Sequence, residues 1–283
     1  MSKKMRPVDR RHVLRLIGAI AVCGATALQV LGVLAKRATG AVAATASAAR
    51  SFPTASYDWT KHRWAFGVDA TRCIGCLSCV TACKTENGVP MDPHHFRTWV
   101  ERYVYLEGEA EPRVDSQADS ADLAAAPGLG SVYSYRFADV DDGKKVDKAF
   151  FVPKLCNHCE QPPCVQVCPT GATYRTEDGV VLIDQDYCIG CRYCVQACPY
   201  GARTFNEAYG VADKCTWCYH RITKGLKPAC VEVCPVGARI FGDLDDPQSD
   251  ISQFIRDNRV EVLKPAMGTH PTVYYVGIDK DVR

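Results

Sequence analysis

Sixteen of the seventeen cysteines in this chain fall into four groups of four, and their spacing is typical of metal-ligating thiols. In the third group, CIGCRYCVQACP (188–199), thiols stand at positions i, i+3, i+6 and i+10, and Pro199 follows the last one. The first group, CIGCLSCVTAC (73–83), repeats this spacing, whereas the second and fourth groups are more open. The four groups are Cys73, Cys76, Cys79 and Cys83; Cys156, Cys159, Cys164 and Cys168; Cys188, Cys191, Cys194 and Cys198; and Cys215, Cys218, Cys230 and Cys234.

Three chemistries use cysteines at this density: disulfides, zinc sites and iron–sulfur clusters. Three thiols at i, i+3 and i+6 in one short loop can hold three corners of a single cubane, and the third group has the run of a bacterial ferredoxin. Zinc would leave the third thiol of each run unused, and disulfides do not require groups of four. Gly75 and Gly190 allow the loops to turn peptide N–H groups towards the sulfurs. The spacing favours four [4Fe–4S] clusters, and an exported zinc-binding or structural module is the alternative.

The N-terminal segment has the features of a twin-arginine export signal. Residues 10–35 place the pair Arg10 and Arg11 before a modest apolar run, with basic residues after it. The run 16–35 is twenty residues long, enough to span a bilayer, so residues 1–49 are a signal peptide or an uncleaved membrane anchor. Iron–sulfur clusters are built in the reducing cytoplasm and this route exports folded cargo, so signal and cysteines agree. We expect the protein at the periplasmic face of the cytoplasmic membrane.

The overall charge gives no indication of nucleic-acid binding, because 34 Lys and Arg against 32 Asp and Glu leave a formal net charge of +2. The sequence also lacks a P-loop, a Rossmann glycine pattern and a nucleophile elbow. We therefore expect a non-catalytic electron-transfer protein. Cations near the cysteine groups can raise the potentials of the clusters. The candidates are Lys84, Lys154, Lys214, Arg192 and Arg203.

An internal repeat surrounds the cysteines. CPTGAT (168–173), CPYGAR (198–203) and CPVGAR (234–239) share Cys-Pro-x-Gly-Ala. The prolines end any helix that carries the preceding cysteine, and the glycines turn the chain into a short extended segment. Residues 172–184 are predicted to form a hairpin around Asp178-Gly179. This rhythm predicts an α+β fold with two tandem bacterial-ferredoxin-like 2[4Fe–4S] modules.

The remaining segments frame these modules. We expect 60–105 with 205–240 to form one module, 150–204 to form the other, and 106–149 to be an acidic insertion of loop and hairpin. The final segment, 241–283, is predicted to be a docking extension.

Secondary structure is also expected in the insertion and the extension. In the insertion, 107–131 is predicted to be a surface loop, and 131–137 (SVYSYRF) and 148–152 (KAFFV) to pair as a hairpin. In the extension, 242–258 is predicted to contain a capped helix and 271–278 a strand.

With these residues in place, the chain resembles the four-cluster ferredoxin-type subunits of bacterial respiratory oxidoreductases, the family of the dimethyl sulfoxide, polysulfide, thiosulfate and tetrathionate reductase electron-transfer subunits. The likeness runs from about His62 to Asp279, outside 107–149, and includes HRWAFGVDATRCIGC, LCNHCEQPPCVQVCPTGATYRTEDGVVLID and GVADKCTWCYHRI. It implies an electron relay between a multispanning, quinone-reactive membrane subunit and a molybdopterin catalytic subunit or multihaem cytochrome. The substrate of such a complex is expected to be a sulfur compound.

The resemblance also implies which cysteines share a cluster, because in this family the fourth cysteine of a run binds the neighbouring cluster. Group one is then combined with group four, and group two with group three. The implied sets are set A (Cys73, Cys76, Cys79 and Cys234), set B (Cys215, Cys218, Cys230 and Cys83), set C (Cys156, Cys159, Cys164 and Cys198) and set D (Cys188, Cys191, Cys194 and Cys168).

Overall fold

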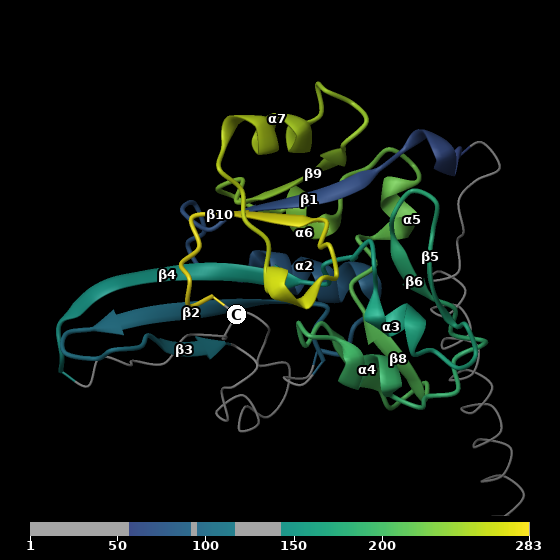
Figure 1. The fold of residues 1–283 in the computed structure, drawn as a ribbon, viewed down its shortest axis with the longest axis horizontal. Coiled ribbons are helices and arrows are strands. Elements are labelled where there is room, and N and C mark those ends of the chain that lie inside the picture. Colours follow the sequence, from purple (N-terminus) through teal and green to yellow (C-terminus); the bar gives the residue numbers. More distant parts are fainter. Residues whose placement is uncertain (1–56, 92–94, 117–142, 283) are drawn as a thin grey trace, which may run out of the picture. The chain divides into compact units, whose positions relative to one another are not determined.

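The computed structural model of the chain describes residues 57–91, 95–116 and 143–282. The twin-arginine signal predicted in 1–49 and much of the predicted insertion lie outside these residues. Within the described ranges, no helix is both long enough and apolar enough to cross a bilayer. Figure 1 shows the elements, which are η1 (Trp59–Lys61), β1 (Trp64–Asp69), α2 (Ser78–Asn87), β2 (Thr98–Leu106), β3 (Arg113–Ser116), β4 (Val146–Leu155), α3 (Pro163–Gln166), β5 (Thr173–Arg175), β6 (Val181–Ile183), α4 (Tyr193–Ala197), β7 (Arg203–Asn206), β8 (Val211–Lys214), α5 (Tyr219–Ile222), α6 (Ala229–Glu232), β9 (Arg239–Asp243), α7 (Asp250–Asp257), η4 (Pro265–Met267) and β10 (Val273–Val276).

Sheet A is three-stranded, with β1 in the middle, β9 antiparallel on one side and β10 parallel on the other. Four consecutive residues of β1, from Ala65 to Val68, are buried. This burial follows from cover on both faces, since Gly67 lies against Phe254 of α7 while Phe66 stacks on Trp217 at 6.2 Å between ring centroids. The Trp217 side chain is completely buried, so sheet A and the cysteine segments share one core.

The helix and the strand predicted in the C-terminal segment are both confirmed. Ser249 caps α7, because its Oγ accepts a hydrogen bond from the Ser252 backbone N–H at 3.2 Å. Strand β10 forms an edge of sheet A, with Phe66 opposite Val273. In Figure 1, α7 covers the sheet next to β9.

Sheet B, with the order β3-β2-β4, corrects one prediction for the insertion and leaves another untested. The KAFFV residues lie in β4, which pairs antiparallel with β2 from Thr98 to Leu106, and the predicted partner 131–137 lies outside the described residues. Residues 113–116, predicted to be loop, form β3 instead. Arg102 explains this pairing, since its guanidinium donates to both carboxylate oxygens of Asp115, at 2.9 and 2.6 Å. Tyr103 stacks on Phe150 across the β2–β4 pair, at 5.3 Å between ring centroids.

The cysteine segments form short helices and two hairpins. The hairpin predicted at 172–184 is confirmed, as β5 pairs with β6 and Tyr174 lies opposite Leu182. Strands β7 and β8 form a second hairpin. Helix α4 ends at Ala197, and Cys198 before Pro199 is extended, as the Cys-Pro pattern indicates. Helix α2 packs on α6 and α3 packs on α4, so group one lies with group four and group two with group three.

Candidate iron–sulfur cluster sites

The thiols of set A line one hollow. Cys73, Cys76 and Cys79 come from the loop before α2 and its first turn, and Cys234 comes from the end of the α6 segment. The wall opposite is made by Val100 of β2 and Pro153 of β4. Gly75 in the loop has a φ of +67°, a conformation that glycine adopts without steric cost.

The thiols of set C line a second hollow of the same kind. Cys156, Cys159 and Cys164 surround it, and Cys198 joins them from across the module. Burial, together with the neighbouring thiols of the set, raises the pKa of the Cys159 thiol to about 12. The structure therefore brings Cys198 of group three to the three leading cysteines of group two.

Set B is the most deeply buried of the four sets. All four of its thiols are buried. Burial, and after it the neighbouring thiols of Cys215, Cys230 and Cys218, raise the pKa of the Cys83 thiol well above its usual value. The Asn87 side-chain amide links the two halves, because its Nδ2 lies 3.6 Å from the Cys83 sulfur and 3.5 Å from the Cys218 sulfur. Cys83 thus lies among cysteines that are more than a hundred positions later in the chain.

Set D is brought together only in part. Cys194 packs with Cys164 of set C and with Cys188 in one small buried cluster, and Cys191 is exposed. The described contacts of Cys168 are local, with the Thr170 hydroxyl at 3.8 Å and the Thr173 backbone N–H at 3.4 Å. The place of Cys168 in this set therefore stays a prediction.

Backbone N–H groups point at the sulfurs in several of these loops. The N–H of Ala238 lies 3.2 Å from the Cys234 sulfur, and that of Trp217 lies 3.4 Å from the Cys215 sulfur. Such bonds stabilise a thiolate and tune the potential of the cluster that the thiolate binds.

Of the five predicted cations, Arg203 and Lys214 lie against the thiols. The Arg203 Nη2 donates to the Cys164 sulfur at 3.1 Å, and the Lys214 Nζ donates to the Cys215 carbonyl at 2.7 Å. Lys84 lies over the Phe96 ring, Arg192 lies over the Phe205 ring, and Lys154 pairs with Glu101 at 2.6 Å.

Two cations were missed by the sequence analysis, the buried Arg239 and the partly buried Arg97. Arg239 lines the hollow of set A, and Arg97 forms an ion pair with Asp213 at 2.9 Å beside Cys83 and Cys215. Arg239 occupies the same place in CPVGAR as Arg203 in CPYGAR, and this repeat was the signal that would have found it.

His158 lies in the core between the hairpins and sheet A. It is completely buried, its Nδ1 accepts a hydrogen bond from the Val181 N–H at 3.0 Å, and its ring stacks on Trp217 at 4.0 Å. Burial and the charge of Lys214 hold the pKa of His158 well below its usual value, so the imidazole is neutral. The His158 and Trp217 rings therefore pack against each other in this core.

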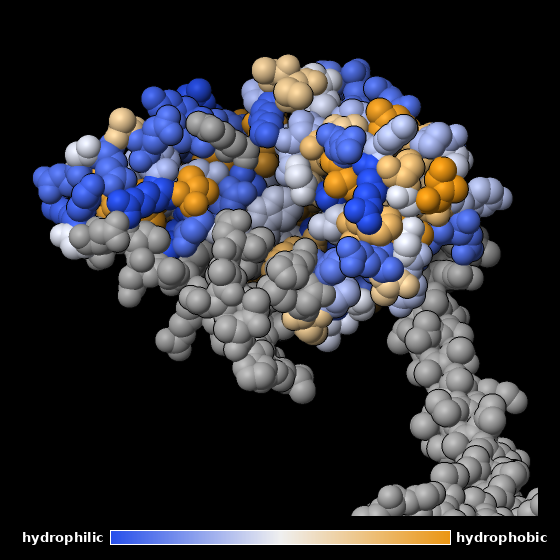
Figure 2. Space-filling view, turned by 90° about the horizontal axis from the view of Figure 1, so that it is seen from below, coloured by the Kyte–Doolittle hydropathy of each residue, from blue (hydrophilic) through white to orange (hydrophobic). Residues whose placement is uncertain are grey.

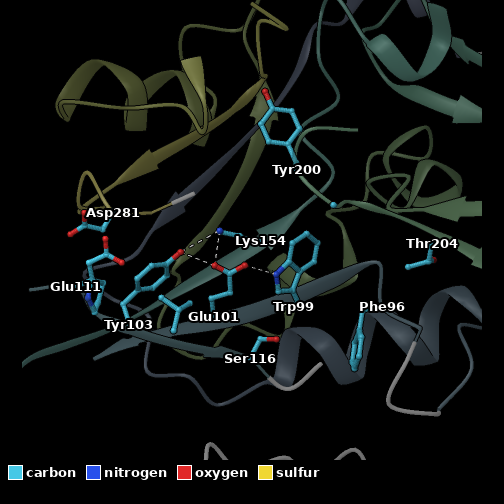
Figure 3. Close-up of a pocket in the computed structure, with 13 residues that line it drawn as sticks. Phe96, Trp99, Glu101, Tyr103, Glu111, Ser116, Lys154, Tyr200, Thr204 and Asp281 are labelled. Carbon is cyan, nitrogen blue, oxygen red and sulfur yellow. Dashed lines mark hydrogen bonds and ion pairs between the residues drawn. The ribbon is translucent and has the colours of Figure 1, made fainter. Parts of the chain in front are cut away.

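A larger cavity, of about 600 Å³, lies on one face of sheet B and contains none of the cysteines. Figure 3 shows its charged centre, where Glu101 accepts hydrogen bonds from Trp99 at 2.9 Å and from Tyr103 at 2.7 Å and pairs with Lys154. Tyr200 lines both this cavity and the hollow of set C.

The donor set at each site fits an iron–sulfur cluster. Four thiols line each of the hollows of sets A and C, and thiolate sulfur suits soft metals. Within the described ranges, no three His, Cys, Asp or Glu side chains lie close enough to hold a single metal ion. The four thiols of each of these two sets instead surround a shared hollow, as the corners of a cubane require.

Comparison with known proteins supports the same cofactor. Two family models described as "4Fe-4S dicluster domain" match residues 72–172 and 147–244, so two such domains give four clusters and the sixteen cysteines match that number.

Relatives with known names cover most of the chain. A tetrathionate reductase subunit of Salmonella typhimurium is 41% identical over 222 residues, 77% of this chain and 74% of the relative. A putative dimethyl sulfoxide reductase iron-sulfur subunit of Halobacterium salinarum is 40% identical over 227 residues, 74% of this chain and 77% of the relative. The Hdr-like menaquinol oxidoreductase iron-sulfur subunit 1 of Archaeoglobus fulgidus is 38% identical over 256 residues, 76% of this chain and 83% of the relative. Because this likeness extends over both cysteine modules, the chain belongs to the family of [4Fe–4S] electron-transfer subunits of respiratory oxidoreductases.

Proposed function

We propose that this chain relays electrons between a multispanning, quinone-reactive membrane subunit and a molybdopterin catalytic subunit or multihaem cytochrome outside the cytoplasmic membrane. Each of sets A to D is proposed to hold one [4Fe–4S] cluster, and each cluster accepts or gives one electron. The chain itself transforms no substrate in this proposal.

The observation that carries this proposal is the serial order of the four sets. Between neighbouring sets, either a cysteine of one set raises the pKa of a cysteine of the next, as Cys79 does for Cys230 and Cys156 does for Cys215, or two cysteines share a buried contact. The pairs are Cys79 and Cys230 between A and B, Cys215 and Cys156 between B and C, and Cys164 and Cys194 between C and D. An electron that enters at set A can therefore leave at set D, or the reverse.

The two ends of this series reach the surface. Cys76 of set A and Cys191 of set D are the exposed cysteines among the sixteen. Apolar side chains stand exposed beside them, with Ile74 next to Cys76, and Ile189 and Tyr193 next to Cys191. Figure 2 shows hydrophobic residues among hydrophilic ones over the module that carries α3 and α4, whereas the outer end of sheet B is hydrophilic. Exposed apolar groups at both ends favour docking of a partner at each.

The names of the relatives indicate the chemistry of the partners. Two are subunits of tetrathionate and dimethyl sulfoxide reductases, and a third belongs to a menaquinol oxidoreductase. We therefore propose a quinol at one end of the relay and a sulfur compound at the other. The direction of flow is a property of the partners.

Purification of the complex from native membranes under anaerobic conditions tests this function. We expect the chain to copurify with a multispanning membrane protein and a soluble partner, and a menaquinol analogue to reduce all four clusters. A chain that purifies alone, with clusters that quinol does not reduce in the membrane fraction, would contradict the relay.

Export is tested separately through the arginine pair. The double variant Arg10→Lys and Arg11→Lys should leave the protein in the cytoplasm with its clusters intact, because the signal is read as a pair. Unchanged delivery to the periplasmic face would contradict the twin-arginine route.

A further inference from the structure

Three buried cations lie at the three junctions between successive cysteine sets. Arg239, Lys214 and Arg203 are 3%, 1% and 4% exposed. In the part of the chain that the structure describes, none of the three has a carboxylate partner. A buried charge without a counter-ion is costly, so each needs an anion at its site.

Arg239 lies at the junction of sets A and B. Its Nη2 donates to the Thr98 hydroxyl at 2.8 Å, while Nε and Nη1 are buried without an acceptor among the described residues. Arg239 lines the hollow of set A, and Cys79 of set A and Cys230 of set B both raise the pKa of its guanidinium. The guanidinium therefore lies in the region where two clusters meet.

Lys214 lies at the junction of sets B and C, which is also the junction of the two modules. Its Nζ donates to the main-chain carbonyls of Val181 and Cys215. Val181 lines the hollow of set C and Cys215 belongs to set B, so the ammonium group lies between the two sets.

Arg203 lies at the junction of sets C and D. Its Nη2 donates to the Cys164 sulfur of set C at 3.1 Å and its Nη1 to the Thr173 hydroxyl at 3.2 Å, while its Nε has no acceptor among the described residues. Cys194 of set D also raises the pKa of the Arg203 guanidinium.

Arg97 supplies the contrast within the same protein. It is also close to thiols of set B, but Asp213 binds it through two contacts, Nε at 2.9 Å and Nη2 at 2.9 Å. The charge of Arg97 is therefore balanced, whereas the charges of the three junction residues are available to the clusters.

We propose that Arg239, Lys214 and Arg203 act as junction cations, each raising the reduction potentials of the two clusters between which it lies. A thiolate-ligated cluster is negative and becomes more so on reduction, so a fixed cation in the low-dielectric interior stabilises the reduced form. Because each cation faces two sets, its loss shifts two neighbouring clusters together. The inference rests on the cluster sets of the proposed function.

The test is an electron paramagnetic resonance redox titration of the full chain, purified anaerobically, with iron and sulfide measured on every sample. Arg239→Gln should lower the potentials of clusters A and B, Lys214→Met those of B and C, and Arg203→Gln those of C and D. We expect at least a tenfold fall in the reduced-to-oxidised ratio at fixed ambient potential, which is 59 mV for a one-electron couple. Arg239→Lys and Arg203→Lys keep the charge and should keep the potentials.

A complementary variant removes the counter-ion of a cation instead of the cation itself. It keeps the test decisive if a neutral variant fails to assemble its clusters. Asp213→Asn releases the charge of Arg97 beside Cys83 and Cys215, so the potential of cluster B should rise. Signals of the terminal clusters are assigned with Cys76→Ser and Cys191→Ser.

Several results would overturn the inference while leaving the electron relay intact. The first is that the neutral variants assemble all four clusters with unchanged reduction potentials. The second is that the lysine variants shift the potentials as much as the neutral variants do. The third is that the potential of cluster B does not rise in Asp213→Asn. A wild-type chain without iron and sulfide would instead defeat the proposed function, so the two failures are distinguishable.

Discussion

Replacement of Gly190 by alanine should remove the cluster of set D while leaving the other three in place. Gly190 lies in the loop between Cys188 and Cys191 with a φ of +69°, and an added Cβ would stand 2.4 Å from the Gly210 carbonyl oxygen. Real Cβ contacts essentially never fall below 3.0 Å, so the cysteine loop and the Gly210 backbone must separate by at least the difference, 0.6 Å. Metal–ligand distances tolerate about 0.2 Å, so the movement exceeds what the cluster accepts.

Gly171→Ala is the matched control for this prediction. Gly171 has almost the same φ, +71°, but a Cβ there would meet nothing within 4 Å. It therefore has only the backbone cost, about 1–2 kcal/mol, and should keep all four clusters. The assay is iron and sulfide content with the resonance spectrum of the reduced protein, and Gly190→Ala should lose about a quarter of the iron. Full iron in Gly190→Ala, or an equal loss in Gly171→Ala, would refute the reasoning.

Three further predictions address the crossed ligand, the buried phenols and the packing of α7. Cys198→Ser should alter the spectrum of cluster C first, and a change confined to cluster D would show the crossing to be wrong. Burial and Asp178 raise the pKa values of Tyr57 and Tyr219, so their contribution to stability is complete below about pH 10 and is lost as the pH rises further. Cluster absorbance should therefore fall less steeply with rising alkaline pH in the double variant Tyr57→Phe and Tyr219→Phe than in the wild-type protein. The same fall in both proteins would contradict this. Gly67→Ala places a Cβ 2.8 Å from the Phe254 ring and should destabilise the packing of α7 by about 1–3 kcal/mol. Faster proteolysis within α7 would show this loss, and an unchanged cleavage rate would contradict it.

The features that were predictable from the sequence are those encoded in short stretches. Cysteine spacing, the Cys-Pro-x-Gly-Ala repeat and the Asp178-Gly179 turn each lie within about a dozen residues, and the hairpin they predict forms between Thr173 and Ile183. The capped helix after Ser249 and the strand at 273–276 were predictable for the same reason.

What the sequence did not reveal depends on contacts between distant segments. The pairing of strand β4 with β2, in which Phe150 stacks on Tyr103, was not predicted, because local patterns carry no information about so distant a partner. The parallel pairing of Phe66 with Val273 joins opposite ends of the described chain. Arg239 was overlooked although the repeat marks it, because its burial against two cysteine sets appears only in three dimensions.

The central claim is that the chain holds four [4Fe–4S] clusters rather than another thiol-bound group. Its most direct test is a joint analysis of iron, acid-labile sulfide and zinc in the anaerobically purified full chain. We expect about four irons and four sulfides for every four clustered cysteines, with no zinc in stoichiometric amount. Stoichiometric zinc without sulfide would contradict the account.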